Sequence, residues 1–194
     1  MTADHKDDLH RYLREGREAL LWKLGGLSDY DVRRPLVPTG TNLLGLVKHV
    51  ACVEAGYFGA TFGRPFAEPT PWDDADADPT ADMWATAEES RDDILGLYDR
   101  VREHADATIE ALDLDAPGEV AWWRPGNRTV TLHRILVHVT AEVHRHAGHA
   151  DIVRELIDGA AGVREGGSNQ PPGDADWWAA YRDRLDAVAR SFRS

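Results

Sequence analysis

The sequence predicts an all-α protein: a four-helix bundle followed by a C-terminal helical extension. Four long segments repeat apolar residues at every third or fourth position, and prolines and glycines separate these segments. The chain shows no internal repeat and no alternation of strands with helices, which argues against an α/β fold. We assign the bundle to residues 1–160. We expect residues 161–194 to form a flexible connection and a helix that packs on the bundle or on a partner subunit.

The first two bundle helices are predicted from residues 7–27 and 43–62. Apolar residues recur at the helical period in the first segment, and paired glycines end it. Thr41 or Asn42 offers the side-chain oxygen that caps the second helix. That helix ends at Gly63, shortly before a proline that cannot continue it.

The third helix follows an irregular connection. Residues 64–79 contain four prolines and a run of aspartates, so they form a surface segment with no periodic pattern. Asp78 and Thr80 offer caps with a proline between them, which predicts that the third helix begins here and runs to about Leu112. The aspartates lack the glycine and the glutamate that a calcium-binding loop needs, so we interpret them as a solvated run of charge.

The fourth bundle helix is predicted over residues 131–158, where apolar residues form one stripe that ends at Gly159. Residues 119–130 before it are aromatic and β-branched around a Pro-Gly turn, which predicts a short hairpin or an irregular loop. A last amphipathic segment, residues 177–192, forms the C-terminal helix, whose tryptophans are expected to cover the bundle or a dimer partner. We also expect a homodimer.

The composition excludes several classes of function. Asp and Glu number 34 against 22 Lys and Arg, so the net charge is −12 at pH 7. Such a chain repels the phosphates of nucleic acids and of anionic membranes, and no apolar run approaches the roughly 20 residues of a membrane span. The N-terminus is charged and lacks the apolar stretch of a secretory signal. We expect a cytoplasmic protein with neither nucleic acid nor membrane as a partner.

Histidines gather on the fourth helix. Five of the nine fall within seventeen residues: His133, His138, His144, His146 and His149. At about 100° per residue, His146 lies at the centre of the apolar stripe, Glu142 about 40° to one side and His149 about 60° to the same side. An unpaired buried carboxylate costs on the order of several kcal/mol, so Glu142 requires an explanation. A metal ion, an ion pair with a buried cation, or a water-filled cavity would each supply one.

A third inward residue lies on the second helix, where His49 faces the same way as Leu46 and Val53. A histidine and a glutamate on one helix are more often a structural hydrogen-bonded pair than a set of ligands. Two histidines and a glutamate on two helices of a bundle are instead typical of a metal site. Three nitrogen and oxygen ligands with open positions indicate a catalytic rather than a structural divalent metal.

The run AEVHRHAGHADIVRELIDG, together with a histidine on the second helix, resembles the DinB superfamily of metal-binding four-helix bundles. The resemblance extends over residues 5–160 and is to the branch of mycothiol-dependent maleylpyruvate isomerase and mycothiol S-transferase. It implies a DinB-like bundle in which the metal ligands, catalytic through the metal, are His49, Glu142 and His146. Many members have histidine at the position of this glutamate. His149 and Asp151 are implied to orient a ligand without binding the metal.

The resemblance also implies an activity, that of a divalent-metal-dependent thiol transferase or isomerase. Zinc is the expected metal, with nickel, iron and manganese as alternatives, and a mycothiol-like thiol is the expected cosubstrate. A divalent ion lowers the pKa of such a thiol and holds a thiolate ready to attack a small electrophile. Two other functions stay open: a metal-dependent hydrolase of a small molecule, in which water replaces the thiol, and a non-catalytic metal-binding bundle in stress response.

Two further groups of residues lie near the predicted site. Trp123 and Arg124 precede the fourth helix, where an aromatic ring would stack on a sugar-bearing cofactor, although packing is the commoner role of such a ring. Arg124 or Arg128 would hold a substrate carboxylate. Cys52 follows His49 by three residues and lies about 60° around the helix from it. Free cysteines are common in protein cores, so we interpret Cys52 as a core residue.

Overall fold

The computed structural model describes residues 5–74, 76–168 and 170–193, and it confirms the predicted all-α class. The bundle helices are α1 (His5–Leu21), α3 (Leu43–Phe58), α4 (Arg91–Ala111) and α5 (Leu132–Asp158). Short elements join them: α2 (Asp29–Arg33), the 3-10 helices η1 (Trp22–Leu24), η2 (Ala60–Phe62), η3 (Pro71–Asp73) and η4 (Pro125–Asn127), and the strands β1 (Pro117–Glu119) and β2 (Thr129–Thr131). A last helix, α6 (Ala175–Ser191), follows the bundle.

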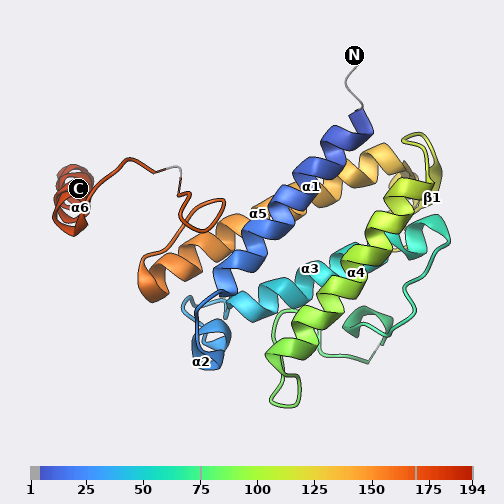
Figure 1. Ribbon diagram of the computed structural model, residues 1–194, viewed down its shortest axis with the longest axis horizontal. Coiled ribbons are helices and arrows are strands. Elements are labelled where there is room, and N and C mark those ends of the chain that lie inside the picture. The colour runs from blue at the N-terminus through green and yellow to red at the C-terminus, as the bar shows by residue number, and fades with distance from the viewer. Residues whose placement is uncertain (1–4, 75, 169, 194) are drawn as a thin grey trace.

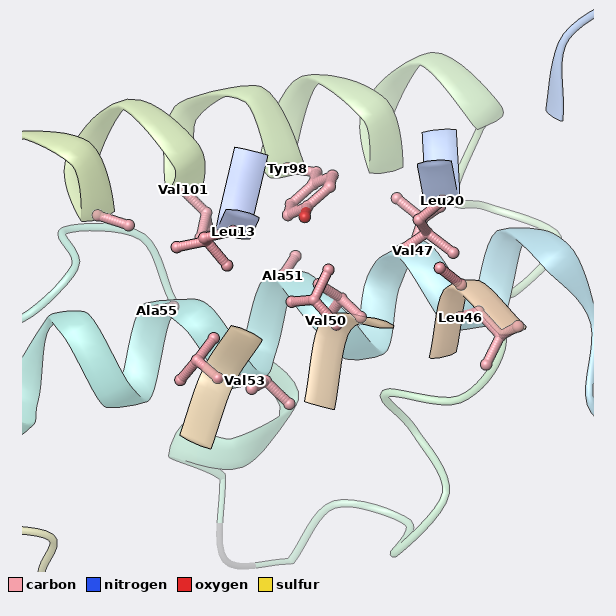
Figure 2. Close-up of a cluster of buried hydrophobic side chains, with 14 of the residues drawn as sticks. Leu13, Leu20, Leu46, Val47, Val50, Ala51, Val53, Ala55, Tyr98 and Val101 are labelled. Carbon is pink, nitrogen blue, oxygen red and sulfur yellow. The ribbon is translucent and has the colours of Figure 1, made fainter. Parts of the chain in front are cut away.

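The bundle helices pack in pairs, α1 along α5 and α3 along α4, and α3 also contacts α5 (Figure 1). Apolar side chains from several helices meet between them, including Leu13, Val50 and Tyr98 (Figure 2). Full burial of one large aliphatic side chain contributes roughly 1.5–3 kcal/mol, so this core supplies most of the driving force for folding. The central helix is α3, where 14 of 16 residues are buried. The two exceptions are His49 and Gly56, and both line cavities.

A side-chain cap sets the start of α3 as the sequence predicts, but the predicted end at Gly63 is wrong. The α-helix ends at Phe58, where Gly59 leaves the helical conformation, and the 3-10 helix η2 follows. Asn42, rather than Thr41, caps α3, because its Oδ1 accepts the backbone N–H of Gly45 at 2.8 Å. Thr131 caps α5, and Gly159 ends that helix with a φ of 80°, a left-handed conformation that glycine adopts without strain.

The predicted start of α4 at Thr80 is wrong, since the helix begins only after Ser90, its cap. The residues between these positions cross α3 in turns and bends. Lys48 of α3 holds them there, because its buried ammonium donates to the carbonyl of Trp84 at 3.1 Å and pairs with Glu89 at 2.7 Å. A buried ammonium needs such partners, and this requirement outweighs the local helical pattern.

Two short elements complete the connections. β1 and β2 pair antiparallel, which confirms a hairpin rather than an irregular loop before α5. The sequence did not predict α2, which Ser28 caps by accepting the backbone N–H of Asp31 at 3.1 Å. Both elements lie in segments too short to show a period.

A buried ion pair joins three helices of the bundle. Arg17 of α1 donates to both carboxylate oxygens of Glu54 on α3, at distances between 2.5 and 3.1 Å. The hydroxyl of Tyr98 on α4 donates to the same carboxylate at 2.9 Å, and burial together with the charge of Glu54 raises the pKa of that hydroxyl. Arg17 also pairs with Asp106 of α4 at 2.6 Å. The arginine therefore ties α1 to α3 and to α4 in the core.

The helix α6 stands apart from the bundle in Figure 1, and none of its residues is buried. Asp174 caps it by accepting the backbone N–H of Trp177 at 2.8 Å. Large apolar side chains remain exposed along it: Trp177, Tyr181, Leu185, Val188 and Phe192. The packing of this helix on the bundle or on a partner subunit stays a prediction.

Composition alone would allow one stretch of the described chain, Leu43–Phe62, to cross a membrane. Within the bundle 83% of that stretch is buried against the other helices. Its apolar character is that of a core helix, and no membrane span is indicated.

Replacing Arg17 with Met leaves the Glu54 carboxylate buried and unpaired, and we expect the free energy of unfolding to fall by about 3–5 kcal/mol. The double variant Arg17→Met/Glu54→Gln removes both charges and keeps an acceptor for Tyr98, so it should recover much of this loss. Denaturant unfolding followed by circular dichroism measures both variants. A single variant as stable as the wild type would contradict the structural role of the pair.

Candidate metal centre

The three side chains predicted as metal ligands meet between α3 and α5. His49 comes from α3, and Glu142 and His146 come from α5, one helical turn apart. Each offers one ligand atom, and these atoms all lie within 4.8 Å of one another. The two imidazole rings are 4.6 Å apart between centroids. The predicted convergence of the three residues is confirmed.

Glu142 lies at the edge of this group rather than in the core. Its side chain is 27% exposed, against 6% for the side chain of His146. Its Oε1 is 2.9 Å from Nε2 of His146, so the two groups share a hydrogen bond. The carboxylate is therefore satisfied without a buried cation, which was one of the three explanations open at the level of the sequence.

The three donors line a cleft of about 630 Å³. Val37, Met83 and Ile152 form apolar parts of its wall. Small-molecule sites typically measure roughly 300–1,000 Å³ and are mostly apolar, with a few polar groups that fix the ligand. The donor atoms are thus accessible to a small molecule that enters the cleft.

The electrostatics favour metal-binding forms of the donors. Burial lowers the pKa of His146, the neighbouring His49 lowers it further, and Glu142 opposes this only in part. The imidazole of His146 is therefore neutral at pH 7 and keeps a lone pair on one nitrogen. Burial acts to raise the pKa of Glu142, but the hydrogen bond from His146 and the favourable electrostatic interaction with that ring outweigh it and lower that pKa. The carboxylate is ionised.

This set of donors fits a divalent cation. Zinc accepts neutral imidazole nitrogens and carboxylate oxygens at about 2.0–2.2 Å, and three protein ligands leave a position for a substrate. Among the residues that the structure describes, no other three histidine, cysteine or acidic side chains are grouped in this way.

The chain matches the mycothiol-S-transferase family over residues 8–159, which span all four bundle helices and leave α6 outside. It belongs to this family. No curated protein matches the chain. Membership makes the chain an enzyme of the transferase type whose thiol is related to mycothiol.

Asp82 is a residue of the candidate site that the sequence did not reveal. Its buried carboxylate lies 2.6 Å from Nδ1 of His49 and accepts the indole N–H of Trp72 at 3.0 Å. Carboxylates that accept from one imidazole nitrogen orient the ring and direct the other nitrogen toward a metal. No spacing rule could have found it, because 33 residues separate Asp82 from His49.

The two residues implied to orient a ligand differ in their surroundings. Nδ1 of His149 lies 3.4 Å from Nδ1 of His146, beside the cleft. Asp151 instead accepts the backbone N–H of Gly162 at 2.6 Å and lies 3.0 Å from the buried ammonium of Lys23. The contacts of Asp151 thus fasten α5 to η1 and to the chain after α5, and they do not reach the three donors.

Trp123 and Arg124 lie outside the cleft in this transferase. The indole N–H of Trp123 donates to the Tyr57 hydroxyl at 2.9 Å, and its ring meets His138 edge-on at 5.2 Å, so it packs in an aromatic cluster. Arg124 is exposed, and neither residue lines the cleft. Their role in cofactor binding stays a prediction.

Cys52 is a core residue of α3, as the sequence indicates. Its side chain is buried, and burial, reinforced by the nearby charge of Asp82, raises the pKa of its thiol to about 12. A thiol with that pKa is protonated at neutral pH and is a poor nucleophile.

Substituting Asp82 by Ala removes the acceptor of two partly buried hydrogen bonds, from His49 and from Trp72. We expect the free energy of unfolding to fall by about 1–3 kcal/mol, the usual cost of unsatisfied buried groups. Asp82→Asn keeps an oxygen that accepts these hydrogen bonds, so the free energy of unfolding should fall less in this variant. Thermal unfolding of both variants provides the comparison. An equal loss of stability in the two variants would argue against the hydrogen bonds of Asp82 as the source of the stabilisation.

Proposed function

We propose that the protein is a divalent-metal-dependent transferase in which His49, Glu142 and His146 hold the metal. The observation that carries this proposal is the convergence of the three donors on one cleft, in a chain of the mycothiol S-transferase family. We propose zinc as the metal, although nickel, iron and manganese accept the same ligands.

The proposed chemistry is transfer of the sulfur of mycothiol, or of a similar small thiol, to a small electrophile. A divalent ion held by these donors lowers the pKa of a thiol, so that thiolate is present at neutral pH. Asp82 holds the ring of His49 in one orientation by accepting from Nδ1. The apolar wall of the cleft excludes water from one side of the donors and so strengthens their electrostatic effect.

Glu142 sets the charge of the proposed centre. A carboxylate adds one negative charge that a third histidine would not, so a thiol bound here should be acidified less than at a site with three histidines. Its depressed pKa keeps this charge in place at neutral pH. The glutamate thus adjusts the reactivity of the thiol as well as holding the metal.

We further propose that the enzyme acts in the cytoplasm and forms a homodimer. The net charge of −12 disfavours nucleic acids and anionic membranes as partners. The exposed apolar side chains of α6 are a surface that a second subunit would cover.

Substitutions at Glu142 test this proposal. Glu142→Ala should abolish thiol transfer and weaken zinc binding. Losing a residue that only hydrogen-bonds a metal ligand costs roughly 10–100-fold in metal affinity, and losing the ligand itself should cost more. Glu142→His preserves the one-turn spacing to His146 and should retain metal. Glu142→Gln should bind metal weakly, because a neutral amide oxygen is a poor replacement for a carboxylate.

Metal content by mass spectrometry and the rate of mycothiol transfer to 1-chloro-2,4-dinitrobenzene are measured for all three variants. Glu155→Ala is the matched control, because Glu155 is an exposed glutamate of the same helix and should change neither quantity. Full metal content and activity in Glu142→Ala would refute Glu142 as a ligand. Wild-type protein that binds metal but transfers no thiol would instead favour a hydrolase or a non-catalytic metal-binding bundle.

A further inference from the structure

A second cavity, of about 560 Å³, lies next to the candidate metal centre. Its walls come from α3, from residues 65–82 and from the hairpin loop before α5. The lining residues used below are Gly56, Trp72, Asp73, Asp74, Asp78 and Trp122. The volume lies within the roughly 300–1,000 Å³ typical of small-molecule sites.

Two residues that line this cavity, Asp82 and Trp72, also contact His49 of the metal centre. Asp82 lines the cavity, and the same carboxylate binds Nδ1 of His49 at 2.6 Å. The ring of Trp72 lies 6.0 Å from the ring of His49 between centroids. A molecule in the cavity would therefore lie one side chain away from the proposed metal ligands.

Two indole rings form the aromatic part of the wall. Trp72 and Trp122 are 44% and 50% exposed, which is unusual for such large apolar side chains. Both flank Gly56: a Cβ at that position would lie 3.3 Å from Trp122 and 3.8 Å from Trp72. The glycine thus keeps the floor between the indoles open, and two exposed aromatic faces on one cavity indicate a ligand that covers them.

The charged side chains that line the cavity are acidic. Among the described residues that line it, four are aspartates and none is lysine or arginine. Local hydrogen bonds hold the carboxylates at the rim in place, since Asp73 accepts from Thr70 at 2.7 Å and Asp78 accepts from Thr80 at 2.7 Å. The bonds from Thr80 also lower the pKa of Asp78. The aspartates interpreted above as solvated charge therefore give the mouth of an aromatic cavity a negative potential.

We propose that this cavity binds small organic cations, such as alkyl- or arylammonium compounds, at a site separated from the proposed metal ligands by the side chains of Asp82 and Trp72. Indole faces attract cations, and surrounding carboxylates strengthen that attraction. A ligand with a carboxylate is disfavoured here, and Arg124 and Arg128, which were expected from the sequence to hold a carboxylate, do not line the cavity.

Three probes of similar size and different charge test the proposal: benzyltrimethylammonium, benzyl alcohol and benzoate. Calorimetric titration of the full chain should give at least about tenfold tighter binding of the cation than of benzoate, with the alcohol between them. Trp122→Ala should weaken the binding of the cation and the alcohol severalfold. Asp74→Asn/Asp78→Asn, which keeps the side-chain oxygens that accept local hydrogen bonds, should weaken only the cation, severalfold.

The control Asp183→Asn/Asp186→Asn makes the same change of net charge on α6, away from the cavity, and should leave all three affinities unchanged. Equal affinities for the three probes, no binding, or an equal effect of both double variants would overturn the proposal. The titrations are repeated after metal removal with EDTA. Cation binding that persists after metal removal would support the cavity independently of the metal centre. Metal-loaded protein that binds the cation but transfers no thiol would refute the proposed function and leave the cavity supported.

Discussion

A fully buried carboxylate on the central helix α3 determines the rotation of that helix about its own axis. Glu54 has no exposed surface and is satisfied by Arg17 of α1 and Tyr98 of α4. His49 precedes Glu54 by five residues, about 140° around the helix. Anchoring the glutamate toward α1 and α4 therefore directs the histidine toward α5. An ion pair remote from the cleft thus sets the direction from which one proposed ligand approaches the other two.

The irregular chain between α3 and α4 also fixes the orientation of His49, from outside the bundle. Lys48 binds its backbone at Trp84, and Asp82 in the same segment binds His49. Because loops place functional groups where helices alone cannot, a segment without regular structure is well suited to hold both partners. It also supplies Trp72 and the aspartates of the second cavity, so one connection serves both candidate sites.

Helical periodicity explains what the sequence could predict. The direction of a side chain on a helix depends on local spacing, so His49, Glu142 and His146 and the ends of α5 were accessible to prediction. The later start of α4 and the role of Asp82 were not, because they depend on contacts between residues more than thirty positions apart. Asp151 illustrates a third case. It is close to His146 in sequence, but five residues turn it about 140° away around the helix.

The burial of α3 on nearly every side has a consequence for synthesis of the chain. It packs against α4 and α5 and binds α1 through the ion pair of Arg17 with Glu54. Of these helices, α5 is the last to leave the ribosome. A nascent chain that ends before residue 132 therefore exposes an apolar helix with the composition of a membrane span. A chain of residues 1–131 alone would therefore bind chaperones or aggregate through that exposed surface. The four bundle helices therefore form one folding unit. Its folding is completed only when α5, the helix that carries Glu142 and His146, has been synthesised.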